Sequence, residues 1–151
     1  MTRQTTEPFN VLIIDDERGD VELIRSAIRE GRYRCNIADV PDGIEGLAYL
    51  RRNSPVYQDA PTPHLVLLDL NMPRKNGREV LAEVKSDRSL ARIPIVILTT
   101  SDAERDVAQS YDLGASGFVT KPVDIDELFE AIHGIQDYWF GTVQSPVRTM
   151  N

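Results

Sequence analysis

The chain has 151 residues, 41% hydrophobic and 27% charged, which suits one soluble globular domain and leaves no room for two ordinary ones. The formal net charge of −7 argues against a general nucleic-acid-binding surface and against docking on an anionic membrane. Cys35 is the single cysteine, so an internal disulfide is excluded. Residues 1–8 carry no signal-peptide core, and no apolar run reaches the about 18 residues of a membrane span, so we expect a cytoplasmic protein.

Strand and helix patterns alternate five times along the chain. The expected strands lie at residues 9–14, 33–40, 65–68, 95–98 and 117–120. The expected helices lie at residues 18–30, 43–52, 78–86 and 103–112, and a fifth begins near residue 123. This alternation predicts an α/β fold with a parallel sheet and helices on both of its faces. Residues 1–8 are expected to be a disordered lead-in, residues 9–140 the folded domain and residues 141–151 a tail.

Apolar positions predict which side of each helix meets the sheet. The first helix has a clear stripe, formed by Val21, Ile24, Ala27 and Ile28. In the later helices we expect these residues to face the core: Ile44, Leu47 and Ala48; Val80, Leu81 and Val84; Val107, Ala108 and Tyr111; and Ile125, Leu128, Phe129, Ile132, Ile135 and Trp139. A proline-rich connection over residues 53–63 separates the second helix from the third strand, and Val56 and Tyr57 are expected to pin it to the domain.

Polar side chains follow four of the predicted strands, at the point where each strand ends. Asp15-Asp16 follow the first strand, Asp69 the third, Thr99 the fourth and Lys121 the fifth. Each residue alone has an ordinary structural explanation, such as a turn former, a helix-terminal acid or a surface charge. Because the carboxyl ends of parallel strands meet at one edge of the sheet, where ligands bind in such folds, we expect them to converge.

The chemistry of this group suits a metal and a phosphoryl group. Three carboxylates held close together need a cation, and Mg²⁺ suits oxygen ligands, with the Asn71 backbone carbonyl able to complete the shell. Lys121 should be a cation in the site, and Thr99 a hydroxyl donor. A phosphoryl group on Asp69 would offer oxygens to the metal, Lys121 and Thr99, with Asp69 as the nucleophile.

The sequence resembles the receiver domain of two-component response regulators over residues 9–140. The resemblance rests on Asp15-Asp16, the run Asp69-Leu70-Asn71-Met72-Pro73 with Gly77, Thr99, and Lys121-Pro122. It implies a flavodoxin-like (βα)5 fold with strand order 2-1-3-4-5, the doubly wound order found in the chemotaxis member of this family. A finer resemblance, to the single-domain regulators of bacterial phytochromes, would make the kinase partner a light-sensing one.

The resemblance also implies a role for each site residue. Asp69 would accept a phosphoryl group from the phosphohistidine of a sensor histidine kinase. Asp16, Asp69 and the Asn71 carbonyl would bind Mg²⁺, with Asp15 helping partly through water. Thr99 and Lys121 would contact the phosphoryl group, the Lys121–Pro122 bond would be cis, and Phe118 would be the aromatic switch residue. Phosphorylation would then reshape the surface formed by the fourth helix, the fifth strand and the fifth helix.

We expect no further domain after the fifth helix, and therefore expect output through protein surfaces. The consecutive aromatics Tyr138, Trp139 and Phe140 predict a homodimer that uses the same surface and the C-terminal arm, unless the arm folds back on its own domain. The protein would be a signalling phosphoacceptor and not an enzyme acting on other substrates.

Two other classes share parts of this pattern. A haloacid-dehalogenase-type phosphatase also uses a nucleophilic Asp with Mg²⁺, Thr and Lys, but it usually has a second acid where this chain has Asn71. A flavin-binding flavodoxin has a phosphate loop rich in Ser, Thr and Gly after the first strand. Here that loop is Asp15-Asp16-Glu17, which would repel phosphate.

Overall fold

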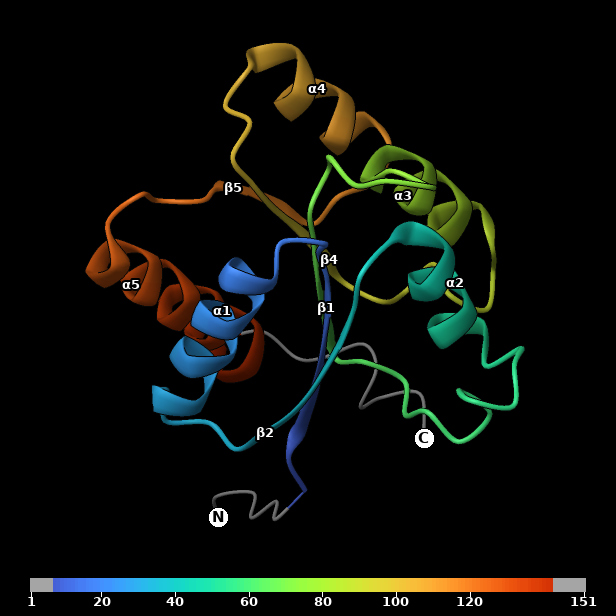
Figure 1. Ribbon diagram of the computed structural model, residues 1–151, viewed down its shortest axis with the longest axis horizontal. Coiled ribbons are helices and arrows are strands. Elements are labelled where there is room, and N and C mark those ends of the chain that lie inside the picture. The colour runs from blue at the N-terminus through green and yellow to red at the C-terminus, as the bar shows by residue number, and fades with distance from the viewer. Residues whose placement is uncertain (1–6, 143–151) are drawn as a thin grey trace.

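Five strands form one parallel sheet (Figure 1). The computed structural model describes residues 7–142, so most of the predicted lead-in and tail lies outside the described residues. The strands are β1 (Phe9–Ile14), β2 (Cys35–Val40), β3 (Leu65–Leu68), β4 (Ile95–Thr99) and β5 (Gly117–Thr120). Their order is β2-β1-β3-β4-β5, which confirms the flavodoxin-like arrangement implied by the resemblance.

Helices cover both faces of the sheet, as predicted. They are α1 (Arg18–Glu30), α2 (Gly43–Arg51), α3 (Gly77–Ser86), α4 (Glu104–Asp112) and α5 (Ile125–Gln136), followed by the π-helical turn η1 (Asp137–Thr142). Figure 1 shows α1 and α5 side by side against one face, with α2 and α3 on the other. The central strand β3 is buried on both faces: Val66 and Leu68 belong to the core on the α2–α3 side, and Leu65 and Leu67 to the core on the α1–α5 side.

Polar caps define where several helices begin. Asp42 caps α2 by accepting a hydrogen bond from the Glu45 backbone nitrogen at 2.9 Å. Asn76 and Glu79 form a reciprocal capping box at α3. Gly77 follows that cap, and a Cβ there would lie 2.2 Å from the Asp69 carbonyl oxygen. This close approach requires glycine, and it packs the start of α3 against the carboxyl end of β3.

The apolar face predicted for α4 is wrong. Its only buried residue is Ser110, whereas Tyr111 is 50% exposed and Ala108 is also exposed. Polar contacts from α3 hold the helix instead, because Arg78 donates to Asp106 at 2.5 Å and to Gln109 at 3.1 Å.

Two other residues predicted to be inward point to solvent. Ile44 is 42% exposed and Ile125 is 53% exposed, and each lies in the first turn of its helix. Of the two residues predicted to pin the proline-rich connection, Tyr57 does so and Val56 does not. Its ring contacts that of Tyr49 and its hydroxyl donates to Glu45 at 2.6 Å, while Val56 is 81% exposed.

The aromatic residues after α5 pack largely on their own domain. The Phe140 ring stacks on that of Phe9, with centroids 4.2 Å apart, and meets Tyr33 edge-on. Trp139 is half-buried against the α1–α5 core, while Tyr138 is 52% exposed. The described part of the arm therefore folds back, and of the three aromatics Tyr138 is the most available to a partner. None of the helices in residues 7–142 has the length and apolar character to cross a membrane.

Candidate functional site

Asp69 lies at the carboxyl end of the most buried strand. It follows Leu68, and its backbone nitrogen donates to the Ile14 carbonyl at 3.0 Å, which ties it to the end of β1. The residue is only 7% exposed. Its Oδ1 has no hydrogen-bond partner among the described residues. A buried carboxylate oxygen without a partner is costly, so the site favours an additional ligand at this atom.

Asp15 and Asp16 converge with Asp69, as predicted. One carboxylate oxygen of each lies within 4.8 Å of the others. Asp15 and Asp69 are buried and Asp16 is exposed, so the group is open to solvent on one side. Burial raises the pKa of Asp15, and hydrogen bonds from Lys121 and from the Glu17 backbone nitrogen partly offset that rise. Three hard oxygen donors around one small space fit a divalent cation such as Mg²⁺.

Lys121 reaches into this acidic group from the end of β5. Its Nζ lies 2.7 Å from Asp15 Oδ2, 2.8 Å from Asp20 Oδ2 and 3.6 Å from Asp69 Oδ2. Burial alone would lower the pKa of Lys121, but its hydrogen bonds to Asp15 and Asp20 outweigh burial and raise the pKa. Lys121 is therefore a fixed cation beside Asp69, as the sequence predicted.

Asp20 is a member of the site that the sequence did not reveal. It lies in the first turn of α1, where an acid is ordinarily explained by the helix dipole. One feature of the sequence could have indicated Asp20: it lies in the helical turn directly after Asp15-Asp16, and that turn faces the carboxyl edge of the sheet.

Thr99 is the last residue of β4, the strand next to β3 in the sheet. It is fully buried, and its hydroxyl has no hydrogen-bond partner among the described residues. Its carbonyl accepts a hydrogen bond from the Lys121 backbone nitrogen at 2.6 Å, which ties the ends of β4 and β5 together. Phe118 is half-buried and packs against the core on the α2–α3 side. The switch role of Phe118 and the ligand role of the Asn71 carbonyl remain predictions.

The predicted cis bond before Pro122 is wrong. No peptide bond among residues 7–142 is cis. The trans form is intrinsically favoured for X–Pro bonds by about 0.5–1 kcal/mol. Lys121 reaches Asp15 and Asp20 with the trans bond, so the ion pairs do not require the cis form.

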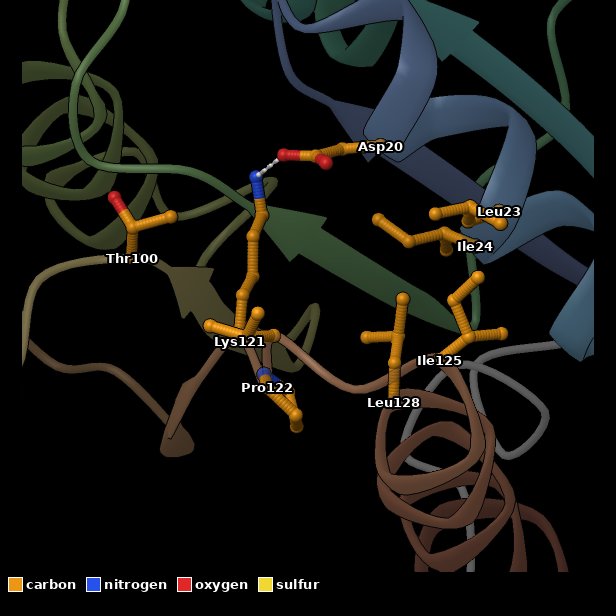
Figure 2. Close-up of a pocket in the computed structure, with 9 residues that line it drawn as sticks. Asp20, Leu23, Ile24, Thr100, Lys121, Pro122, Ile125 and Leu128 are labelled. Atoms are coloured by element: carbon orange, nitrogen blue, oxygen red, sulfur yellow. Dashed lines mark hydrogen bonds and ion pairs between the residues drawn. The ribbon is translucent and has the colours of Figure 1, made fainter.

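A mostly apolar pocket opens beside the acidic group. Figure 2 shows Asp20 and Lys121 at one end, and Leu23, Ile24, Ile125 and Leu128 along its wall. The pocket has a volume of about 200 Å³ and lies between the start of α1, the loop after β5 and the start of α5. Lys121 therefore contacts the acidic group and also lines this pocket.

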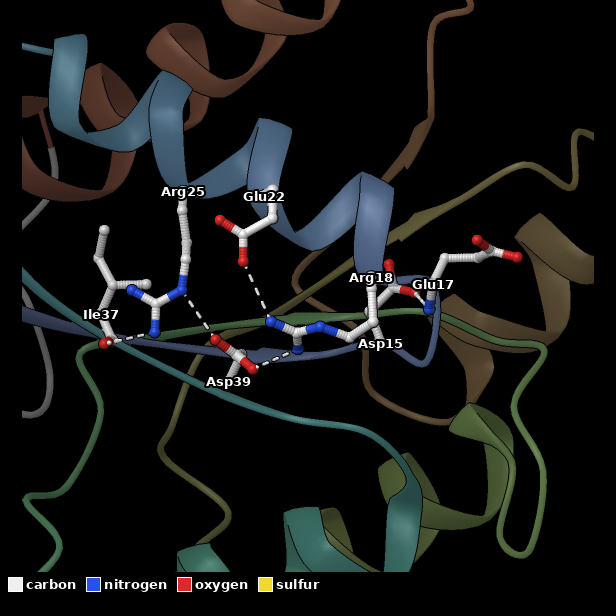
Figure 3. A network of polar contacts seen from close by, with 7 residues as sticks. All are labelled: Asp15, Glu17, Arg18, Glu22, Arg25, Ile37 and Asp39. Carbon is white, nitrogen blue, oxygen red and sulfur yellow. Dashed lines mark hydrogen bonds and ion pairs between the residues drawn. The ribbon is translucent and has the colours of Figure 1, made fainter.

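A second polar network fixes α1, and with it Asp20, to the sheet. Figure 3 shows Arg18 and Arg25 of α1 donating to the two carboxylate oxygens of Asp39 on β2, at 2.7 and 2.8 Å. Burial alone would raise the pKa of Asp39, but these two hydrogen bonds outweigh burial and lower the pKa. Asp39 therefore stays ionised and clamps the start of α1.

Residues 11–133 match the response regulator receiver domain family. The chain belongs to this family. Response regulator Rcp1 of Synechocystis sp. is 37% identical to the receiver domain over 146 residues, which cover 97% of this chain and 99% of Rcp1.

Solved structures agree with this assignment. The crystal structure of the phosphorylated cyanobacterial phytochrome response regulator RcpA has a TM-score of 0.88 at 41% identity, covering 93% of the receiver domain and 99% of RcpA. The Mn²⁺-bound form of Rcp1 has a TM-score of 0.86 at 38% identity, with coverage of 92% and 99%. The receiver domain is thus a response regulator homologous to phytochrome response regulators. The phosphatase alternative is not supported, since the family match and the structural likeness are both to receiver domains.

Proposed function

We propose that the receiver domain accepts a phosphoryl group on Asp69 from a sensor histidine kinase. The observation that carries this proposal is the buried Asp69 Oδ1, which has no hydrogen-bond partner among the described residues, while the Lys121 ammonium lies 3.6 Å from the other oxygen of the same carboxylate. A carboxylate oxygen without a hydrogen-bond donor keeps its lone pairs available for attack on phosphorus, and the phosphoryl group that results brings several acceptor oxygens into the site. Lys121 and Thr99 are the two donors in the site that such oxygens could use.

The transfer needs little beyond positioning and charge neutralisation. An Asp69 carboxylate oxygen attacks phosphorus, the bond between phosphorus and the kinase imidazole nitrogen breaks, and that nitrogen keeps the electron pair. Lys121 is already charged, so it can stabilise the negative charge on the phosphoryl oxygens without any proton transfer. The Thr99 hydroxyl can donate to another of these oxygens, which would satisfy its own buried oxygen.

A divalent cation would be held by Asp15, Asp16, Asp69 and the Asn71 carbonyl. When bound, Mg²⁺ would neutralise the charge shared by the carboxylates and the phosphoryl group. The 4.8 Å cluster of carboxylate oxygens supports this assignment, and the related Rcp1 has been crystallised with Mn²⁺. We infer Mg²⁺ because it keeps room for waters and for phosphate oxygens.

The donor kinase is proposed to be of the phytochrome type, because the similar protein RcpA is described as a phytochrome response regulator. Asp69 phosphorylation would change the surface of α4, β5 and α5 through Thr99 and Phe118. We place this signalling in the cytoplasm, and the net charge of −7 favours neither nucleic acid nor an anionic membrane as a partner. The domain acts as a phosphoacceptor and not as an enzyme on other substrates.

We also propose a homodimer through α4, β5 and α5, with Tyr138 of the arm. Exposed apolar side chains at Tyr111, Val123 and Ile125 support this surface. Light scattering after size-exclusion chromatography should give twice the chain mass, and Tyr111→Glu with Ile125→Glu should give the monomer mass. A monomer mass for the unchanged chain would refute the dimer.

Phosphotransfer read by intact mass tests the main proposal. With a phosphorylated phytochrome-type kinase and Mg²⁺, the wild type should gain one phosphoryl group and Asp69→Asn none. Asp112→Asn is the matched control, because it removes an exposed acid of α4 and should leave transfer unchanged. A phosphoryl group found on Asp69→Asn would refute Asp69 as the acceptor.

A further inference from the structure

Lys121 has two close carboxylate partners, and neither is the proposed acceptor. An ammonium has three N–H donors. Asp15 and Asp20 accept two of them at 2.7 and 2.8 Å, while Asp69 Oδ2 lies at 3.6 Å, longer than a hydrogen bond. The third N–H is therefore left for an acceptor near Asp69.

The two partners come from different elements and differ in exposure. Asp15 is at the end of β1 with its side chain 3% exposed, while Asp20 is on α1 with its side chain 37% exposed. Asp15 also belongs to the carboxylate cluster that fits a divalent cation, whereas Asp20 does not. Any cation held by the cluster would share Asp15 with Lys121, and Asp20 is the partner that remains for Lys121 alone.

Asp20 is itself held in place. Asp20 lies between Arg18 and Arg25 on α1, and both arginines donate to Asp39 of β2 (Figure 3). In Figure 2 the Asp20 carboxylate points at the tip of the extended Lys121 side chain. A long flexible side chain held at its tip loses less conformational freedom when it then engages a further acceptor.

We propose that Asp20 is a positioning residue, which tethers the Lys121 ammonium so that its free N–H meets a phosphoryl group on Asp69. This inference rests on the proposed function of Asp69. Asp20 touches neither the acceptor nor the phosphoryl group and acts only through Lys121. If Asp20 instead competed with the phosphoryl group for Lys121, it would draw the ammonium away from that group.

Binding of beryllium fluoride, a phosphoryl mimic, tests the proposal without a kinase. With Mg²⁺ present, ¹⁹F NMR measures the affinity for the intact chain. Asp20→Ala should bind about five-fold more weakly than the wild type, the ratio that corresponds to about 1 kcal/mol of lost positioning. Asp20→Asn keeps an acceptor oxygen and should recover most of the affinity. Glu30→Ala is the matched control, since it removes an exposed acid at the other end of the same helix.

A double-mutant cycle separates positioning from a merely structural role. In a Lys121→Met background, Asp20→Ala should leave the affinity unchanged, because the residue through which it acts is gone. Tighter binding by both Asp20 variants would identify a competitor and overturn the proposal, and so would wild-type affinity in Asp20→Ala or an undiminished effect in the Lys121→Met background. If the wild type itself binds no beryllium fluoride, or if Asp69→Asn binds it equally well, the proposed function fails instead.

Discussion

A single ammonium organises the charged site at the scale of residues. Lys121 lies among three acids, and its hydrogen bonds to Asp15 and Asp20 hold it charged despite burial. Burial raises the pKa of Asp15, and the hydrogen bond from Lys121 partly offsets this rise by stabilising the ionised carboxylate. Lys121 and a bound cation would therefore both neutralise Asp15, so the effect of each on stability should depend on the presence of the other.

Lys121→Met should make the free energy of unfolding of the domain depend more strongly on Mg²⁺. Without divalent metal, the loss of the ion pair should lower the free energy of unfolding by about 1–3 kcal/mol, because buried Asp15 loses its charged partner. Mg²⁺ should then restore more stability to the variant than it adds to the wild type. Urea unfolding in EDTA and in Mg²⁺ measures both effects.

The control for this prediction is Lys85→Met. Lys85 is also partly buried, but its Nζ donates to the carbonyls of Ala91 and Ile93. Its replacement should change stability by the same amount with and without Mg²⁺. Equal Mg²⁺ dependence in wild type and Lys121→Met would contradict the idea that Lys121 and the metal both neutralise Asp15.

At the scale of elements, α4 is attached differently from the other helices. The other four α-helices each bury at least three apolar or glycine residues, whereas α4 buries only Ser110. Its attachment is polar: Arg78 of α3 donates to Asp106 and Gln109, and the Ser101 hydroxyl donates to the other oxygen of Asp106. Ser101 is two residues after Thr99, so this contact connects α4 to the chain that leaves the site.

Arg78→Ala should loosen α4 without unfolding the domain. A partly exposed ion pair contributes about 1 kcal/mol, so global stability should fall only slightly. Amide hydrogen exchange should become faster in α4 and stay unchanged in α1 and α5. Arg92→Ala, at an exposed arginine, should alter neither. Unchanged exchange in α4 would show that Arg78 does not hold this helix.

The arm after α5 is part of the folded unit, because Phe140 stacks on Phe9 and packs near Tyr33. Phe140→Ala should lower the free energy of unfolding by about 2 kcal/mol, a value reduced from that of a fully buried Phe because the residue is half-buried. Tyr138→Ala should stay within about 0.5 kcal/mol, since Tyr138 is mainly exposed. Chemical denaturation followed by circular dichroism measures both. Equal losses would contradict the packing described for the arm.

At the scale of the whole molecule, the carboxylate cluster links the site to the stability of the fold. Asp15, Asp16 and Asp69 follow the ends of the adjacent strands β1 and β3, so their mutual repulsion acts between these two strands at the carboxyl edge of the sheet. A cation that binds only the folded state stabilises it by mass action.

Divalent metal should therefore raise the unfolding temperature. At 100 times its dissociation constant, Mg²⁺ should add about 2.7 kcal/mol to the free energy of unfolding, and EDTA should remove that gain. Thermal scans across a Mg²⁺ series measure the effect. Asp16→Asn should lose most of the gain, while Asp112→Asn, outside the cluster, should keep it. A gain of equal size in Asp16→Asn would exclude Asp16 as a metal ligand.

The amino-acid sequence by itself determined the alternating fold and the convergence of Asp15, Asp16, Asp69 and Lys121. Both follow from local patterns: apolar runs specify buried strands, and in a parallel sheet the residues after these strands must meet at one edge. It could not determine that Asp20 holds Lys121, that α4 is attached by Arg78, that Phe140 stacks on Phe9, or that the bond before Pro122 is trans. Each of these depends on where two distant segments lie relative to one another, which packing of the whole chain decides and no local pattern encodes.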